Sequence, residues 1–526
     1  MIMQRRFLAL TAAAALVAGC NDGAFLTEKP YDFVGPSNFY KTSGDALAAV
    51  NGVYASLENA APGGANNYYG RNFTMLGEFP GEALTVYLSA TNERSQVDNY
   101  TFPTSHSYIY STWQSAYGAI NRANAVLDNV PAIAMDETLK ARILGEAKFL
   151  RALNYFNLVR LFGGVPIFTH ETTGLDSLQA PRASAADVYT LIVTDLQDAI
   201  KVLPSSKTYA ASDAGRASRG AAKTMLVKVY LHRAATGVGT PADNQAALDM
   251  ARQVVSDGDY SLVSDPATLY DMVDGTLNER NTEVIFDIEN IRQAGLGGNL
   301  GNFFAPRNSS WEASQNGAFE AEQPFFDSFA DTDKRKAATF VLSFPNKSNV
   351  ATPYLTTSTA STAYGADSPY LKKFIDPSPL AGGGSEEPNF IITRYADLLL
   401  MQAEAANEVS GPTPEAYTAI NAVRTRSNVP NLATGLSKQA FKDSLFAERR
   451  KELVGEGPHA YFDSQRNWAW AKARIEANMA AGQLTANKGK SKYPKAQVAL
   501  DDKFKLMPIP QRAIDLNPLL TQNTGY

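Results

Sequence analysis

Apolar residues along much of this chain recur at the three- and four-residue spacing of amphipathic helices. One such run follows Ser184 and ends at Pro204, a second follows Pro241 and ends at Gly258, and a third begins at Thr413-Pro414. The same spacing predicts further helices over 43–58, 109–130, 137–162, 218–235, 394–409 and 437–453.

Several helix ends carry their own signals. Ser184 to Asp187 is a capping box, and Thr240 to Asp243 is a second one with Pro241 at the first helical position. The 137–162 helix is followed by Gly163-Gly164-Val165-Pro166, where glycine supplies a left-handed cap and proline prevents continuation. This glycine pair is a poor phosphate loop because the lysine of that motif is missing.

Paired helices of this length, rich in alanine at contact positions, favour helical hairpins of the tetratricopeptide type. No clean period of about 34 residues is visible, so the repeats are degenerate. Long loop-rich stretches cover 59–69, 295–316 and 344–388, and alternation at 283–288 predicts a strand. We therefore expect a mostly α fold, in which degenerate tetratricopeptide-type hairpins form a scaffold beside a loop-rich subdomain with a few short strands.

The N-terminal residues have the pattern of a lipoprotein export signal. Arg5 and Arg6 precede an apolar run that ends at Cys20, and Leu16-Val17-Ala18-Gly19-Cys20 resembles a bacterial lipobox. The run is too short to span a membrane, which takes about 20 apolar residues. We expect residues 1–19 to be a signal peptide, Cys20 to be lipidated, and 20–36 to be a tether. Cys20 is the only cysteine, so no disulfide within the chain is expected.

The composition excludes only a few classes of protein function. The 526 residues are 44% hydrophobic and 19% charged, which is ordinary for a globular protein. The formal net charge is −5, and there is no basic stripe, so a nucleic-acid partner is not expected. No segment after Cys20 has the length of apolar residues that a membrane span needs.

Six segments, in order, carry a family resemblance. They are 146–166, which ends Phe162-Gly163-Gly164-Val165-Pro166, then 281–286, 394–405, 419–426, 448–457, and the ending from Pro508 to Tyr526. Together they resemble the SusD/RagB type of outer-membrane nutrient-binding lipoprotein. The resemblance implies one integrated globular unit, with an N-terminal helical region at 37–275 and a C-terminal region at 276–526.

The charged residues of these segments are interpreted as parts of the scaffold. Arg394, Glu404, Arg424 and Arg449 lie in predicted helices or next to them. Charged side chains are retained in an interior when they are paired, so we expect ion pairs at helix packing seams.

The sequence gives little support for catalysis or for a metal site. The four histidines, at 106, 170, 232 and 459, share no ligand spacing, and Asp331-Thr332-Asp333 lacks the offsets of a calcium loop. Glu78 and Glu82 could form a glycosidase pair, but 53 acidic residues make such pairs common by chance. We expect a binding protein without enzyme activity, metal or cofactor.

Aromatic residues in polar loops are the candidate ligand contacts. Flat rings stack on the C–H faces of sugars, and amide or guanidinium groups bond the hydroxyls. Trp311 follows Arg307 and Asn308, and Phe303 and Phe304 precede them, while Tyr68 and Arg71 lie in another such stretch. By the resemblance, aromatics before Trp113 also contribute, which adds Tyr108 and Tyr110. Trp113, Trp468 and Trp470 lie in helical context and are expected in the core.

The resemblance implies capture of an extracellular oligosaccharide or polysaccharide and delivery to a SusC-like TonB-dependent outer-membrane transporter. The protein would be held to the outer membrane by its lipid and would face outward. In organisms rich in this family, surface export tends to follow a more acidic stretch after the lipidated cysteine, whereas Asn21-Asp22-Gly23-Ala24 contains only one acidic residue. Peptides or another polymer are alternative ligands, and a surface glycoside hydrolase is a further alternative. A receptor for an ABC transporter should show alternating strands and helices, which this chain lacks. A structural helical-repeat adaptor remains open.

Overall fold

The structure is a computed structural model, and it describes residues 39–58, 68–86, 92–174, 178–270, 272–273, 276–277, 281–293, 296–306, 309–311, 317–345, 351–353, 369–378, 384–480 and 500–526.

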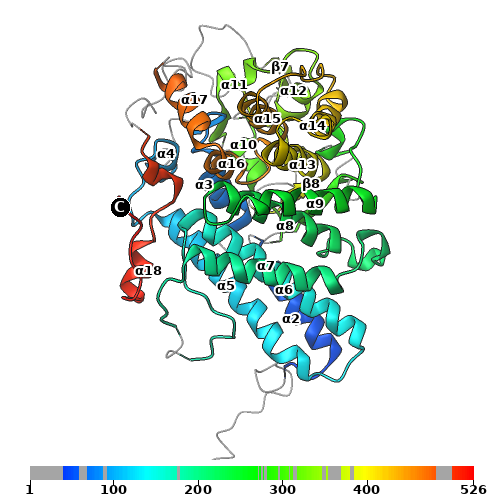
Figure 1. The fold of residues 1–526 in the computed structure, drawn as a ribbon, viewed down its shortest axis with the longest axis vertical. Helices are drawn as coiled ribbons and strands as arrows, with labels where there is room; N and C mark the ends of the chain where they lie inside the picture. The colour runs from blue at the N-terminus through cyan, green and yellow to red at the C-terminus, as the bar shows by residue number, and fades with distance from the viewer. Residues whose placement is uncertain are drawn as a thin grey trace, which may run out of the picture.

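The long helices pack in an order that follows the sequence (Figure 1). The first group lies at one end of the molecule and comprises α2 (Ser43–Ala55), α5 (Ser107–Asn129), α6 (Glu137–Phe162) and α7 (Ala185–Val202). Next come α8 (Arg219–Ala235) and α9 (Ala242–Asp257), followed by α13 (Tyr395–Ser410), α14 (Pro414–Arg426) and α15 (Lys438–Leu453).

Each helix in this series packs on the next. α5 packs on α6, α6 on α7, α7 on α8, α8 on α9, α9 on α13, and α13 on both α14 and α15. The consecutive pairs α5–α6, α8–α9 and α13–α14 are joined by short connections, as in helical hairpin repeats. The predicted mostly α fold with degenerate tetratricopeptide-type hairpins is confirmed.

The predicted helix ends are found close to their expected positions. The Ser184 side chain accepts a hydrogen bond from Asp187 N at the start of α7, and Thr413 accepts one from Ala416 N at the start of α14. Gly163 follows α6 with φ 73°, and Gly258 follows α9 with φ 66°. α9 differs slightly from the expectation, because Pro241 rather than Thr240 is its N-cap.

The chain between α9 and α13 forms most of the short elements. These are β2 (Met272–Val273), β3 (Thr276–Leu277), β4 (Val284–Ile288), α10 (Leu300–Phe304), β5 (Phe319–Ala321), α11 (Gln323–Asp327), α12 (Lys334–Thr339), β6 (Ser343–Pro345), β7 (Ala351–Pro353) and β8 (Phe390–Arg394). The predicted strand at 283–288 is confirmed as β4, which pairs antiparallel with β8. The stretch 295–316, predicted as loop, contains α10.

Short elements outside this region complete the fold. They are η1 (Tyr68–Asn72), α3 (Phe73–Glu78), β1 (Leu84–Val86), α4 (Asn92–Asp98), α16 (His459–Arg466), α17 (Trp468–Ala480) and α18 (Gln511–Leu516). Four two-stranded antiparallel sheets form among the described residues: β1–β5, β2–β3, β4–β8 and β6–β7. Two of these, β1–β5 and β4–β8, join segments that are far apart in the sequence.

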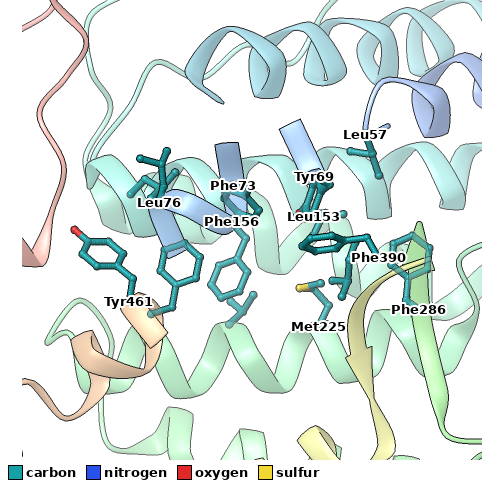
Figure 2. Packing of buried hydrophobic residues seen from close by; sticks show 14 of the residues in the cluster. Leu57, Tyr69, Phe73, Leu76, Leu153, Phe156, Met225, Phe286, Phe390 and Tyr461 are labelled. Atoms are coloured by element: carbon teal, nitrogen blue, oxygen red, sulfur yellow. The ribbon is translucent and has the colours of Figure 1, made fainter. Parts of the chain in front are cut away.

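One hydrophobic core runs through both halves of the chain, from Ala46 in α2 to Leu520 near the C-terminus. α6 crosses it, and every residue from Phe149 to Val159 is buried. Figure 2 shows Tyr69 and Phe73 packed beside Leu153 and Phe156 of α6. Trp113 is buried in this core as predicted, whereas Trp468 and Trp470 are only half-buried.

The predicted ion pairs at the packing seams are confirmed. Arg394 pairs with Glu283, Glu452 and Glu456, and Arg449 pairs with Asp397 and Asp463. Glu404 pairs with Arg466, and Arg424 with Glu448. Among the described residues, Arg394 and Arg449 are two of the largest fully buried side chains, so each guanidinium requires these partners.

In the described part of the chain, no helix is both long enough and apolar enough to cross a membrane.

Candidate ligand-binding site

Three segments that contain predicted ligand residues lie together in the fold: η1, α5 and the region of α10. The β1–β5 pairing sets Leu84 opposite Ala321, which places the chain after α3 beside the region that contains α10. α10 also contacts η1, and η1 contacts the first turns of α5. A hydrogen bond of 2.8 Å from Asn72 Nδ2 to Ser111 Oγ fixes η1 against α5. The polar and aromatic side chains at this junction form the candidate site.

Two arginines and two aromatic rings lie at the centre of this junction. Arg71 of η1 places its Cζ 5.0 Å from the ring centroid of Tyr108 and 5.7 Å from that of Phe303. Arg94 of α4 approaches Phe303 as well, at 4.9 Å. We call Arg71, Arg94, Tyr108 and Phe303 the arginine–aromatic cluster. Arg71 and Tyr108 were predicted as ligand contacts, whereas Arg94 was not.

The rings of this cluster support the guanidinium groups. Phe303 and Tyr108 are 8% and 6% exposed, so little of either ring is open to solvent. His106 closes one side of Tyr108, with a ring-to-ring distance of 5.3 Å in an edge-on arrangement. Both arginines keep intermediate exposure. The two arginines are therefore more accessible to a ligand than the two rings.

Tyr108 and Tyr110 are separated by the geometry of α5. Positions two apart on a helix point in nearly opposite directions. Tyr110 is half-buried, and Arg512 of α18 places its Cζ 5.0 Å from the Tyr110 ring. Tyr108 therefore joins the arginine–aromatic cluster, whereas Tyr110 lies beside the C-terminal segment.

Trp311 lies against a small second core. This cluster consists of Ala305, Val341, Phe344, Tyr370 and Ile375, and Trp311 packs on it while half-buried. Its ring centroid is 6.4 Å from that of Phe344. Trp311 is therefore partly exposed as a residue, and its role as a ligand contact stays a prediction.

Tyr68 and Phe304 are placed in the interior instead of a surface loop. Tyr68 is 1% exposed, and its hydroxyl accepts a hydrogen bond of 3.0 Å from Asn157 Nδ2 of α6. Phe304 is 0% exposed and packs on Phe319 and Phe374. Neither ring has a face open to a ligand in this conformation. Their polar sequence neighbours suggested exposure, but both rings fill the main core.

Arg307, Asn308 and Cys20 lie outside the described residues. Their predicted roles, ligand contact for the first two and lipidation for the third, stay predictions.

Glu78 and Glu82 are both buried, which argues against the hypothesis that they form a glycosidase pair. Glu78 is 0% exposed, and it accepts hydrogen bonds from the backbone N–H groups of Gly455, His459 and Ala460. Glu82 is 2% exposed and pairs with Arg450 at 2.9 Å and Arg474 at 3.3 Å. Burial raises the pKa of Glu78 to about 8, whereas the two arginines hold the pKa of Glu82 below its ordinary value against the opposing effect of burial. Both carboxylates hold the fold together and do not line a surface cleft.

The buried histidines are engaged with protein groups. His232 uses both ring nitrogens, with Tyr189 Oη and Gln465 Oε1 each at 2.7 Å. His106 Nε2 lies 2.9 Å from the backbone oxygen of Glu93. Within the described ranges, no group of three or more histidine, cysteine, aspartate or glutamate side chains is arranged to hold a metal ion.

The fold and this site define a class of protein: a helical-repeat scaffold that presents arginine and aromatic side chains where loop-rich segments meet. Residues 239–526 match the model of the SusD family, and residues 37–231 match a SusD-like family described as "starch-binding associating with outer membrane". The chain belongs to the SusD family.

Individual relatives agree with this assignment. A SusD-like protein of Formosa agariphila, P2, is 27% identical over 459 residues, which cover 84% of this chain and 86% of the relative. The crystal structure of a SusD homologue from Bacteroides thetaiotaomicron is 25% identical, with a TM-score of 0.80 over 93% of this chain and 98% of that one. A laminarin-binding SusD-like protein is also 25% identical, with a TM-score of 0.71 over 93% of this chain and 100% of that one.

Proposed function

We propose that this chain is a cell-surface lipoprotein that binds an extracellular oligosaccharide or polysaccharide and delivers it to a SusC-like TonB-dependent transporter in the outer membrane. Membership of the SusD family carries the proposal, because the model matched by residues 37–231 is described as starch-binding and associated with the outer membrane. The laminarin-binding relative supports a carbohydrate ligand over a peptide.

The proposed contacts are the predicted residues that keep accessible surface. Trp311 and Tyr110 are half-buried, so each can stack part of its ring on a sugar face. Arg71 can donate hydrogen bonds to ligand oxygens from the edge of its guanidinium group. Tyr108 holds Arg71 in place through the contact at 5.0 Å. Arg307 and Asn308 precede Trp311 in the sequence and remain part of the proposal.

The proposed mechanism is reversible binding without bond cleavage. The interior positions of Glu78 and Glu82 support this, because a glycosidase needs two carboxyl groups on either side of a bound sugar. A reducing-end assay with the retained glycan tests the point. Release of new reducing ends by the purified protein would favour the glycoside hydrolase alternative.

The glycan ligand is tested by affinity electrophoresis of the full-length lipoprotein in detergent. Native gels would contain one polysaccharide each, including starch, laminarin, polygalacturonate and dextran, and a peptide-rich gelatin gel would test the polymer alternative. We expect retarded migration in at least one polysaccharide gel. Migration that is unchanged in every polysaccharide gel and retarded in gelatin would replace the glycan with a peptide ligand.

Trp311→Ala tests the first-choice contact. We expect the variant to lose most of the retardation, because a stacked ring contributes about 0.5–1.5 kcal/mol beyond its buried area in aromatic contacts. Trp468→Ala is the matched control, since Trp468 is also half-buried and its Nε1 donates a 2.9 Å hydrogen bond to Asp502. Equal retardation of parent and Trp311→Ala would remove Trp311 from the site.

The transporter partner is tested separately. The tagged lipoprotein would be cross-linked in intact cells and purified from the outer membrane. We expect a TonB-dependent barrel protein to be purified with it. Recovery of the lipoprotein alone after efficient cross-linking would contradict delivery to such a transporter and would leave glycan binding untouched.

A further inference from the structure

The arginine–aromatic cluster contains two positive charges that come from separate segments and meet at one ring. Arg71 of η1 and Arg94 of α4 both place their guanidinium groups within 5.7 Å of the Phe303 centroid. Arg71 also lies against Tyr108. Stacking on aromatic faces orients a guanidinium group and leaves its edge N–H groups free to donate in the ring plane.

Neither arginine forms a salt bridge with a carboxylate in the described part of the chain, although the charge of Glu93 lies near Arg71. Arg71 donates from Nε to Asn72 Oδ1 at 3.2 Å, and Arg94 Nε is buried without a hydrogen-bond partner. Across the described ranges of the chain, neither guanidinium takes part in an ion pair. The interior arginines differ, because Arg394, Arg449 and Arg466 each face carboxylates at 2.6–3.1 Å.

The environment of Arg71 is unfavourable for a positive charge. Burial lowers the pKa of Arg71, and the nearby charge of Arg94 lowers it further, while Tyr108 and Glu93 act in the opposite direction. Two like charges that share a partly desolvated position destabilise the folded state. A negatively charged group that contacts both guanidinium groups would offset this repulsion and accept hydrogen bonds from their N–H groups.

We infer that the ligand of this site is an acidic glycan, whose carboxylate or sulfate groups are bound by the paired guanidinium groups of Arg71 and Arg94. This inference rests on the proposed function and specifies its ligand class. The planar guanidinium fork matches the two oxygens of a carboxylate or sulfate and forms two parallel hydrogen bonds. Tyr108 and Phe303 act behind the arginines as supports, in keeping with their low exposure.

The test compares glycans that differ only in charge. Affinity electrophoresis of the full-length lipoprotein would use polygalacturonate against its methyl ester, and dextran sulfate against dextran. We expect retardation by the charged member of at least one pair and little by its neutral partner. The net charge of the chain is −5, so retention by a polyanion requires a local positive site. The two pairs distinguish a carboxylate ligand from a sulfate ligand.

Arg71→Gln and Arg94→Gln assign the effect to this site. Loss of one charged hydrogen-bond donor is expected to raise the dissociation constant for the acidic glycan about ten-fold. Arg252→Gln is the matched control, because it removes the same charge from the surface of α9. Thermal unfolding of each variant would be measured alongside, and the comparison of charged and neutral glycans with the parent protein decides the question even if a variant does not fold.

The outcomes distinguish failure of the acidic-ligand inference from failure of the proposed function. Equal retardation by charged and neutral partners would overturn the acidic ligand and support glycan binding. An Arg252→Gln loss as large as that of Arg71→Gln would also overturn it, because the effect would then be general charge attraction. No retardation by any glycan, neutral or acidic, would overturn the proposed function itself.

Discussion

Arg394 and Glu456 form a buried ion pair, in which Arg394 Nε donates to the Glu456 carboxylate over 2.6 Å. Arg394 is the last residue of β8, and Glu456 follows α15, so the pair joins the small β4–β8 sheet to the helical scaffold. The same guanidinium reaches Glu283 at 2.7 Å and Glu452 at 2.6 Å. One cation thus connects three segments that are distant in the sequence.

Removal of that cation should destabilise the whole fold. Arg394→Met leaves Glu283, Glu452 and Glu456 buried with too little positive charge, and loss of one partner of a buried pair costs about 3–5 kcal/mol. Urea unfolding followed by circular dichroism measures the change. Arg252→Met is the control, because its exposed pair with Glu415 should contribute about 1 kcal/mol or less. Similar losses for both variants would contradict the role assigned to Arg394.

His232 should make stability depend on pH under mildly acidic conditions. Burial, with the charge of Arg160 adding to it, lowers the pKa of His232 from 6.5 to about 3. The unfolded chain therefore binds a proton near pH 6.5 that the folded chain takes up only near pH 3. The His232 contribution to stability is present above pH 6.5 and is lost as the pH falls through this window, at up to about 1.4 kcal/mol per pH unit.

His232→Gln should reduce this slope when free energies of unfolding at pH 7, 6 and 5 are compared. The slope should not vanish, because burial also lowers the pKa of His459 to about 3. His170→Gln is the control, since that side chain is 83% exposed. An unchanged slope in His232→Gln would show that His232 is not a source of the acid sensitivity.

Gly77 and Gly52 should respond in opposite directions to the same substitution. A Cβ on Gly77 of α3 would lie 2.0 Å from Pro458 Cβ, at the contact with α16, so Gly77→Ala should destabilise by about 1–3 kcal/mol or more through overpacking. A Cβ on Gly52 of α2 would have nothing within 4 Å, so Gly52→Ala should stabilise by about 0.5–1 kcal/mol through helix propensity. Thermal unfolding of both variants gives the signs, and a stabilised Gly77→Ala would contradict the close packing of α3 on α16.

Cys20→Ala should release the protein from the membrane. The predicted diacylglycerol anchor needs the thiol, and more than one acyl chain is required for stable attachment, since each buried CH₂ contributes about 0.8 kcal/mol. Labelling of growing cells with radioactive palmitate, followed by separation of membrane and soluble fractions, measures the change. We expect the parent to be labelled and membrane-bound, and the variant to be unlabelled and soluble. A variant that stays in the membrane fraction after a salt wash would contradict anchoring through Cys20.

The long helices could be predicted because their signals are local. The Ser184 cap, the left-handed Gly163 and the apolar stripe of α7 all act within a few residues, which is the range over which a helix forms its hydrogen bonds. The ion pairing of Arg394 and Arg449 was predictable in kind, because charges in otherwise apolar helices require partners. Their partners, such as Asp463 for Arg449, could not be predicted from spacing.

Only part of the candidate site could be predicted, because contacts between distant segments bring its residues together. Arg71 and Tyr108 were predicted from polar and aromatic composition and from the family resemblance, but Arg94 has no local signal that distinguishes it from other surface arginines. It belongs to the site because α4 packs beside β1, and β1 pairs with β5 more than two hundred residues later in the chain. Burial of Tyr68 and Phe304 depends on contacts of the same long range.

The sequence by itself therefore determined the long helices, most of their ends and the family resemblance, whereas the lipoprotein signal at Cys20 stays a prediction. Only the tertiary structure decided which aromatic rings enter the core, which stay accessible, and that Arg71 and Arg94 meet at Phe303. The physical reason is the range of the interactions. Helix hydrogen bonds and caps join residues a few positions apart, whereas burial and charge pairing depend on where distant segments come to lie.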